Sequence, residues 1–133
     1  MTSSQPTALI ADDEPLLRSA LTRLLTAAWP ELNIVAEARN GREALELFQI
    51  FKPTVCFLDI HMPGMTGIEV ARQIGRQAHF VFVTAYSEYA VEAFAQGALD
   101  YLVKPVVPER LAETVSRLRE RLGSKQETPD IET

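Results

Sequence analysis

The sequence predicts an α/β fold, a doubly wound parallel sheet with its strands in the order 2-1-3-4-5. Short apolar runs alternate along the chain with segments whose apolar residues recur at helical spacing, and five such pairs fill the sequence. This alternation is typical of βα units that place helices on both faces of a parallel sheet. In the common arrangement of five such units, a crevice forms between the first and third strands, at their carboxyl ends.

Each element is predicted from its apolar pattern and from the residues that bound it. The strands are expected at residues 7–11, 33–38, 55–58, 80–83 and 101–103. The helices are expected at residues 14–29, 41–52, 66–75, 87–97 and 108–123. Pro15 suits a first helical turn, where the missing N–H does no harm. Asn40 with Glu43, and Thr66 with Glu69, have the spacing of capping boxes.

Two glycines and one proline mark the boundaries of the fourth and fifth predicted helices. Gly97 is the expected C-cap of the fourth helix, and Pro108 fits the first turn of the fifth. Gly123 is expected to end that helix. We therefore predict one domain over residues 1–123, with residues 124–133 forming a polar linker or disordered tail.

Composition excludes several classes of protein. The 133 residues include 47% hydrophobic and 23% charged residues, as in an ordinary globular domain. A net charge of −5 argues against nucleic-acid binding by this segment, because such binding neutralises phosphates with basic side chains. Cys56 is the only cysteine, and no window has the length of a membrane span or the core of a signal peptide. We expect a cytoplasmic domain that binds neither nucleic acid nor membrane.

Polar side chains follow four of the five predicted strands. Asp12 and Asp13 follow the first strand, Asp59 the third, Thr84 the fourth and Lys104 the fifth. The carboxyl ends of parallel strands meet at one edge of the sheet, so these groups are expected to converge. Three neighbouring carboxylates need compensation, and Mg²⁺ tolerates such a set of oxygen ligands, with Mn²⁺ as an alternative ion.

Asp59 is the best candidate for a nucleophile. It stands alone between an apolar strand and a Pro-Gly loop, where an incoming phosphorus has in-line access, whereas the adjacent pair Asp12 and Asp13 suits metal binding. The hydroxyl of Thr84 and the ammonium of Lys104 flank the other side. Ala85 leaves room for a phosphoryl group.

Each of these residues also has an ordinary structural explanation. An aspartate after a strand is commonly a turn residue, and two before a helix commonly cap it. A threonine at a strand end reflects β-propensity, and Lys-Pro is a common solvated turn. Only the convergence of all of them at one edge favours chemistry.

The same residues carry a family resemblance. The chain resembles, over about residues 7–122, the receiver domain of bacterial two-component response regulators, which has a flavodoxin-like fold. The matching segments are Leu9-Ile10-Ala11-Asp12-Asp13-Glu14-Pro15, Phe57 to Gly67, Val83-Thr84-Ala85 and Tyr101-Leu102-Val103-Lys104-Pro105.

The resemblance implies roles at the acidic site. Asp59 would accept a phosphoryl group from the phosphohistidine of a histidine kinase. Asp13, Asp59 and the backbone carbonyl of His61 would bind Mg²⁺, with Asp12 helping through water. Thr84, Ala85 and Lys104 would hold the phosphoryl group.

The resemblance also implies a switch. Tyr101 would turn inward when Thr84 moves, and the Lys104–Pro105 peptide bond would be cis. His61 and Tyr86, each two residues after a site residue, would modulate the rates of phosphorylation and dephosphorylation. The switch would alter the face formed by the fourth helix, the fifth strand and the fifth helix, through which a homodimer could form.

The segment from Ala85 to Val106 resembles regulators that carry a C-terminal LytTR-type DNA-binding domain, of the LytR/AlgR-like kind. This implies control of transcription through a domain outside this chain. Three alternatives stay open: a stand-alone receiver acting through protein contacts, a phosphatase with an aspartyl nucleophile, and a receiver-like domain that is not phosphorylated. Against the phosphatase, His61 stands where such enzymes place a second aspartate.

Overall fold

The computed structural model describes residues 5–86, 95 and 97–132, and it confirms the predicted fold. Five parallel strands form one sheet in the order β2-β1-β3-β4-β5. The strands are β1 (Thr7–Ala11), β2 (Asn33–Ala38), β3 (Val55–Leu58), β4 (His79–Thr84) and β5 (Asp100–Val103). The helices are α1 (Pro15–Ala28), α2 (Gly41–Phe51), α3 (Gly67–Ile74), the short 3-10 helix η1 (Gly75–Gln77) and α5 (Pro108–Glu132).

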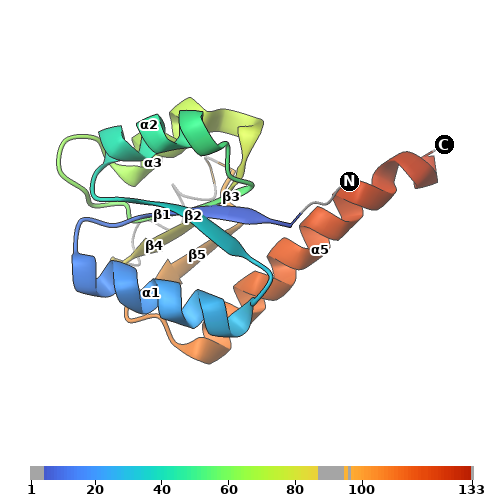
Figure 1. The fold of residues 1–133 in the computed structure, drawn as a ribbon, viewed down its shortest axis with the longest axis horizontal. Helices are drawn as coiled ribbons and strands as arrows, with labels where there is room; N and C mark the ends of the chain where they lie inside the picture. Colours follow the sequence, from blue (N-terminus) through green and yellow to red (C-terminus); the bar gives the residue numbers. More distant parts are fainter. Residues whose placement is uncertain (1–4, 87–94, 96, 133) are drawn as a thin grey trace.

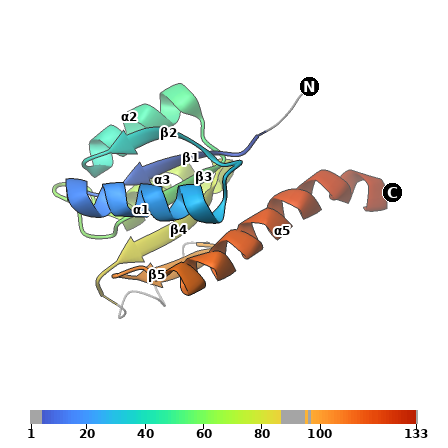
Figure 2. The same ribbon diagram turned by 60° about the horizontal axis from the view of Figure 1, so that its bottom comes forward.

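Helices cover both faces of the sheet. Helices α2 and α3 lie on one face, and α1 and α5 lie on the other (Figures 1 and 2). The fourth predicted helix, at residues 87–97, falls almost wholly outside the described residues. The only prediction made there that the structure describes is at Gly97, which has a positive φ of 89°.

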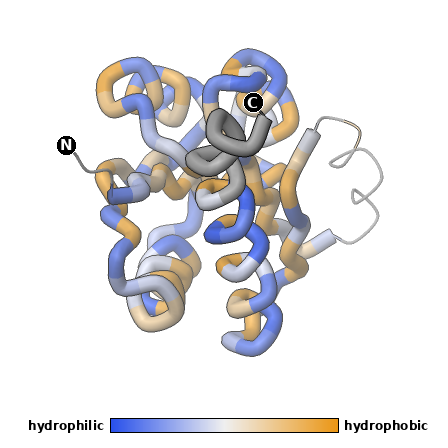
Figure 3. The backbone as a smooth tube through the Cα atoms, turned by 90° about the vertical axis from the view of Figure 1, so that its right-hand side faces the viewer, coloured by the Kyte–Doolittle hydropathy of each residue, from blue (hydrophilic) through white to orange (hydrophobic). Residues whose placement is uncertain are grey.

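Alternation along the strands divides the core into two layers. Leu9, Cys56 and Phe82 point toward α2 and α3, while Ile10 and Phe57 belong to the cluster under α1 and α5. Both clusters consist of buried apolar side chains, and apolar residues gather in the strands between the helical layers (Figure 3). The sheet is therefore held rigidly from both sides, which fixes where its strands end.

Helix starts follow the predicted caps, with one difference. Thr66 and Glu69 form a complete capping box, in which each side chain accepts a hydrogen bond from the other residue's backbone N–H. The Asn40 side chain accepts from the Glu43 N–H at 2.8 Å, as predicted. The Glu43 carboxylate, however, accepts from the backbone N–H of Arg39 at 2.7 Å and also contacts its guanidinium. The neighbouring cation explains why this carboxylate reaches one residue further back.

Helix α5 is longer than the sequence pattern suggests. It runs past Gly123 to Glu132, so the predicted end at Gly123 is wrong. Glycine in a helix costs about 1 kcal/mol relative to alanine but keeps its backbone hydrogen bonds, so it weakens a helix without ending it. The last turns project beyond the sheet (Figures 1 and 2). The division into a domain of residues 1–123 and a polar linker or disordered tail at residues 124–133 stays a prediction.

The one tryptophan lies where α1 ends. Trp29 is the C-cap of α1 and is only 3% exposed, within the cluster that α1 and α5 share. The Arg119 guanidinium of α5 lies 5.6 Å from the centre of the indole ring and also contacts Glu31 at 3.2 Å. This contact ties the far end of α1 to α5.

Candidate functional site

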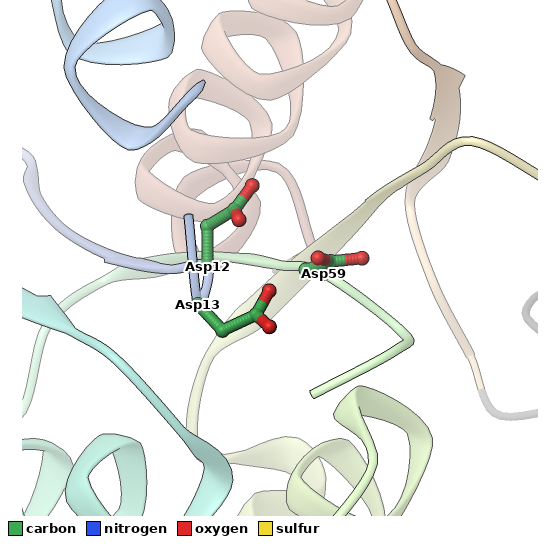
Figure 4. A group of neighbouring side chains, drawn as sticks. All are labelled: Asp12, Asp13 and Asp59. Atoms are coloured by element: carbon green, nitrogen blue, oxygen red, sulfur yellow. The ribbon is translucent and has the colours of Figure 1, made fainter. Parts of the chain in front are cut away.

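The strand register brings the acidic residues together. Ala11 pairs with Leu58 across β1 and β3, and the Asp59 N–H donates to the Ala11 carbonyl at 2.9 Å. The aspartates that follow these two strands are therefore neighbours. Figure 4 shows Asp12, Asp13 and Asp59 side by side at the ends of β1 and β3. One carboxylate oxygen of each lies within 4.8 Å of the other two.

Burial differs among the three acids. Asp12 and Asp59 are 4% and 5% exposed, whereas Asp13 is exposed. The Asp12 Oδ1 accepts from the Glu14 N–H at 2.9 Å, and the Asp59 Oδ1 accepts from the His61 N–H at 3.2 Å. One oxygen of each buried acid is thus held by backbone, and the other faces the crevice.

Lys104 reaches the crevice from the end of β5. Its Nζ lies 2.8 Å from the Asp12 Oδ2 and 3.2 Å from the Asp59 Oδ2. Its backbone N–H donates to the Thr84 carbonyl at 2.8 Å, so the same residue also holds β4. The Lys104–Pro105 peptide bond is cis, as the resemblance implies.

Burial and neighbouring charges shift the pKa values of Asp59 and Lys104. Burial raises the pKa of Asp59 above its usual range; Lys104 opposes this, and the charge of Asp12 adds to it. Burial works to lower the pKa of Lys104, but hydrogen bonds and charge interactions with Asp12 and Asp59 outweigh it and raise the pKa. Lys104 therefore stays an ammonium ion, and burial makes negative charge on Asp59 less favourable than it is in water.

The donor set fits a divalent metal ion. Three carboxylates and one ammonium carry a formal charge of −2, which one Mg²⁺ would balance. Carboxylate oxygens are the ligands that Mg²⁺ prefers, and the exposed side of Asp13 leaves space for the waters it retains. Asp12, Asp13 and Asp59 are the residues that could hold such an ion.

The hydroxyl of Thr84 belongs to the same edge of the sheet. Thr84 is fully buried at the end of β4, and its Oγ accepts a long hydrogen bond of 3.4 Å from the Tyr86 N–H. The Tyr101 hydroxyl donates to the Tyr86 carbonyl, and the Tyr101 side chain is only 6% exposed. The ring of His61 meets the ring of Tyr86 edge-on, with centres 4.7 Å apart. Tyr86 thus contacts Thr84, Tyr101 and His61, which lies two positions after Asp59.

Sequence reasoning missed two residues that support the site. Arg18 donates to the Asp12 backbone carbonyl at 2.7 Å. At Gly67, an added Cβ would lie 2.2 Å from the Asp59 carbonyl oxygen, so the start of α3 approaches Asp59 as closely as a glycine permits. The Arg18 contact reaches back six residues, a spacing that no helix or turn pattern predicts, whereas Gly67 at the first position of a capped helix was a usable signal.

A second buried acid lies away from the crevice. Asp100 is 1% exposed, and its oxygens accept from Arg110 at 2.8 and 3.1 Å and from Thr114 at 2.6 Å. Arg117 also lies 3.0 Å from it. Both of these α5 arginines thus hold this carboxylate.

Comparison with known proteins gives the family to which the chain is similar. Residues 8–116 match the family described as the response regulator receiver domain. The REC domain of AraT, a response regulator from Geobacillus stearothermophilus, superposes with a TM-score of 0.85 and 35% identity, over 92% of this chain and 99% of that one. The response regulatory domain of mrkE from Klebsiella pneumoniae gives a TM-score of 0.80 and 31% identity, over 86% and 96%.

Sequence relatives are about twice as long as this chain. A response regulatory protein of Vibrio cholerae is 52% identical over 119 residues, covering 87% of this chain and 46% of that protein. The sensory transduction protein LytT of Oceanobacillus iheyensis and the transcriptional regulatory protein BtsR of Salmonella typhi are each 42% identical, covering 89% and 90% of this chain and 50% of each relative. The chain thus spans about half the length of these relatives. Among its described helices, none is both long and apolar enough to cross a membrane.

Proposed function

This chain belongs to the response regulator receiver domain family, and we propose that it is a phosphorylation-gated switch in which Asp59 accepts a phosphoryl group from a histidine kinase. One observation carries the proposal. The Asp59 carboxylate is buried, keeps one oxygen toward the crevice, and lies against Lys104 and the pair Asp12 and Asp13.

The proposed transfer is a single displacement at phosphorus. A carboxylate oxygen of Asp59 attacks, a P–O bond forms, and the P–N bond of the phosphohistidine breaks. The departing imidazole nitrogen keeps the electron pair and takes a proton from solvent. Lys104, freed from its contact with Asp59, neutralises charge on the transferred group, and the Thr84 hydroxyl donates to it.

The acidic residues prepare this step. A Mg²⁺ ion would be held by Asp13, Asp59 and the His61 carbonyl, with Asp12 acting through water, and it would neutralise charge on the phosphoryl group. Mn²⁺ has the same preference for oxygen ligands. The Glu14 N–H fixes one Asp12 oxygen, which keeps the carboxylate pair oriented without solvent reorganisation.

The proposed switch runs through Tyr86. Phosphorylation draws the Thr84 hydroxyl toward Asp59, and Tyr86 follows because its N–H is bonded to that hydroxyl. Tyr101 is already buried and bonded to Tyr86, so we infer that phosphorylation stabilises this inward arrangement over an outward one, a shift between existing populations. His61 and Tyr86 cover the site from outside and would set its rates.

Output and partners follow from the family. Receiver domains of response regulators are phosphorylated by histidine kinases, and we propose a cognate histidine kinase as the partner and a cytoplasmic location for this domain. We further propose that the switch controls a homodimer through the surface of β5, α5 and the segment before β5. Transcription is the proposed output, through a DNA-binding domain that this chain does not include, since LytT and BtsR are regulators about twice as long.

Acetyl phosphate labelling tests the acceptor. We expect Mg²⁺-dependent incorporation of one phosphoryl group, followed by intact mass or Phos-tag electrophoresis. Asp59→Asn should abolish it, and Glu43→Gln, whose carboxylate is bonded to Arg39, should label as the unmodified protein does. Labelling of Asp59→Asn at an unchanged rate would reject Asp59 as the acceptor.

A further inference from the structure

Arg18 connects α1 to two strands at the rim of the acidic site. Its Nη1 donates to the Asp12 backbone carbonyl at 2.7 Å, and its Nε lies 3.2 Å from a Glu37 carboxylate oxygen on β2. The Arg18 side chain is only 15% exposed. Both contacts use the fixed fork of one guanidinium, so they are made together.

The Asp12 carbonyl belongs to the turn that aims two carboxylates. This turn is also held by the Asp12 N–H, which donates to the Ala38 carbonyl at 3.0 Å, and by Asp12 Oδ1 with the Glu14 N–H. Arg18 supplies the charged donor among these contacts. Hydrogen bonds with a charged donor are stronger than neutral ones, so losing this one should loosen the turn.

Charge alone does not explain an arginine at this place. A cation close to three carboxylates weakens their attraction for a metal ion. Glu37 offsets that charge, and the pair Arg18–Glu37 is neutral as a whole. Arg18 can thus hold the backbone of Asp12 while the pair adds little positive electrostatic potential at the crevice.

We propose that Arg18 is a positioning residue for Mg²⁺ binding, which holds the Asp12–Asp13 turn in place by gripping the Asp12 carbonyl and Glu37 at once. This inference rests on the proposed function, because it takes Asp13 and Asp59 as metal ligands. Residues that hold metal ligands from outside typically change metal affinity by 10- to 100-fold when removed, and we expect about tenfold here.

The test measures Mg²⁺ affinity rather than phosphorylation. Amide NMR shifts of the unphosphorylated protein are followed during Mg²⁺ titration. Arg18→Met should raise the dissociation constant about tenfold. Arg18→Lys, which keeps the charge but lacks the fork, should also bind more weakly. Arg39→Met is the matched control, because it removes an arginine that pairs with Glu43, and it should bind Mg²⁺ as the unmodified protein does.

The outcomes separate the two proposals. If Arg18→Met binds Mg²⁺ as tightly as the unmodified protein, or more tightly because a repulsive charge has been removed, the positioning role is wrong. An Mg²⁺ affinity in Arg18→Lys equal to that of the unmodified protein would show that the two simultaneous guanidinium contacts are not needed, and would overturn the proposal. Glu37→Gln weakens the outer contact and also leaves the Arg18 charge without its offset, so it too should bind Mg²⁺ more weakly. Unchanged affinity in this variant would count against the grip, and it decides the matter should Arg18→Met fail to fold. Failure of the unmodified protein to bind Mg²⁺ at the three aspartates would reject the metal site itself.

Discussion

Gly67 lies so close to Asp59 that one methyl group should disturb both the fold and the site. In Gly67→Ala, the new Cβ would meet the Asp59 carbonyl oxygen at 2.2 Å and its carbonyl carbon at 2.9 Å, whereas real contacts of this kind essentially never fall below 3.0 Å. The neighbour is backbone, and the Gly67 N–H is itself bonded to the Ile60 carbonyl at 2.9 Å. Neither side can yield without moving the loop that carries Asp59.

The expected cost follows from overpacking. Inserting a methyl group into a tightly packed place costs about 1–3 kcal/mol, and alanine recovers up to about 1 kcal/mol in helix propensity. Because the clash in Gly67→Ala is with backbone, we expect a net loss of about 2 kcal/mol in the free energy of unfolding. A shift of about 1 Å at a reacting group can also reduce the rate on the order of 100-fold, so labelling by acetyl phosphate should slow strongly.

Urea unfolding followed by circular dichroism, at several Mg²⁺ concentrations, measures this effect. Gly123→Ala is the matched control, because a Cβ there meets nothing within 4 Å and the residue lies inside α5. The control should gain stability, by up to about 1 kcal/mol, and label normally. Equal stability and equal labelling rates in Gly67→Ala and the unmodified protein would refute the reasoning.

Three further results are expected from urea unfolding. Without Mg²⁺ at pH 7, Asp59→Asn should be more stable than the unmodified protein, because burial raises the pKa of Asp59 and makes its charge unfavourable in the fold. Burial tends to raise the pKa of Asp100, but hydrogen bonds headed by that from Arg110 outweigh it and lower the pKa. The contribution of ionised Asp100 to the free energy of unfolding is therefore complete above the ordinary carboxyl pKa of about 4. It should be lost as the pH falls through the pKa that Asp100 has in the folded protein, and Asp100→Asn should lack this loss of stability at acid pH. Asn40→Ala should cost about 1 kcal/mol, because the Glu43 N–H loses its cap.

These results can each be contradicted. A less stable Asp59→Asn would mean that the contact of Asp59 with Lys104 outweighs burial. If Asp100→Asn and the unmodified protein lose stability equally as the pH falls, that loss belongs to another carboxyl group. An Asn40→Ala variant of unchanged stability would show that water replaces the cap at no cost.

The sequence predicted those features whose causes are local. Apolar runs located all five strands to within a residue or two, and the Thr66 box formed as its spacing predicts. The convergence of Asp12, Asp13 and Asp59 also followed from the sequence, because parallel strands share one edge for their carboxyl ends.

Features that depend on contacts between distant residues escaped prediction. The Arg18 side chain meets Glu37 across 19 positions, and nothing in the spacing announces it. The Arg117 side chain likewise reaches Asp100 across 17 positions of the chain. The end of α5 was misjudged for a different reason: Gly123 marks a weak point in a helix, but local preference alone does not end one.

The place of Trp29 determines what its fluorescence can report. It caps the end of α1 opposite the acidic residues, and 14 helical residues separate those ends by about 21 Å. Emission from this indole therefore senses its packing against Arg119 and α5, rather than an ion at the crevice. A change in emission on phosphorylation would be a direct optical sign that the modification had reached the opposite end of the molecule.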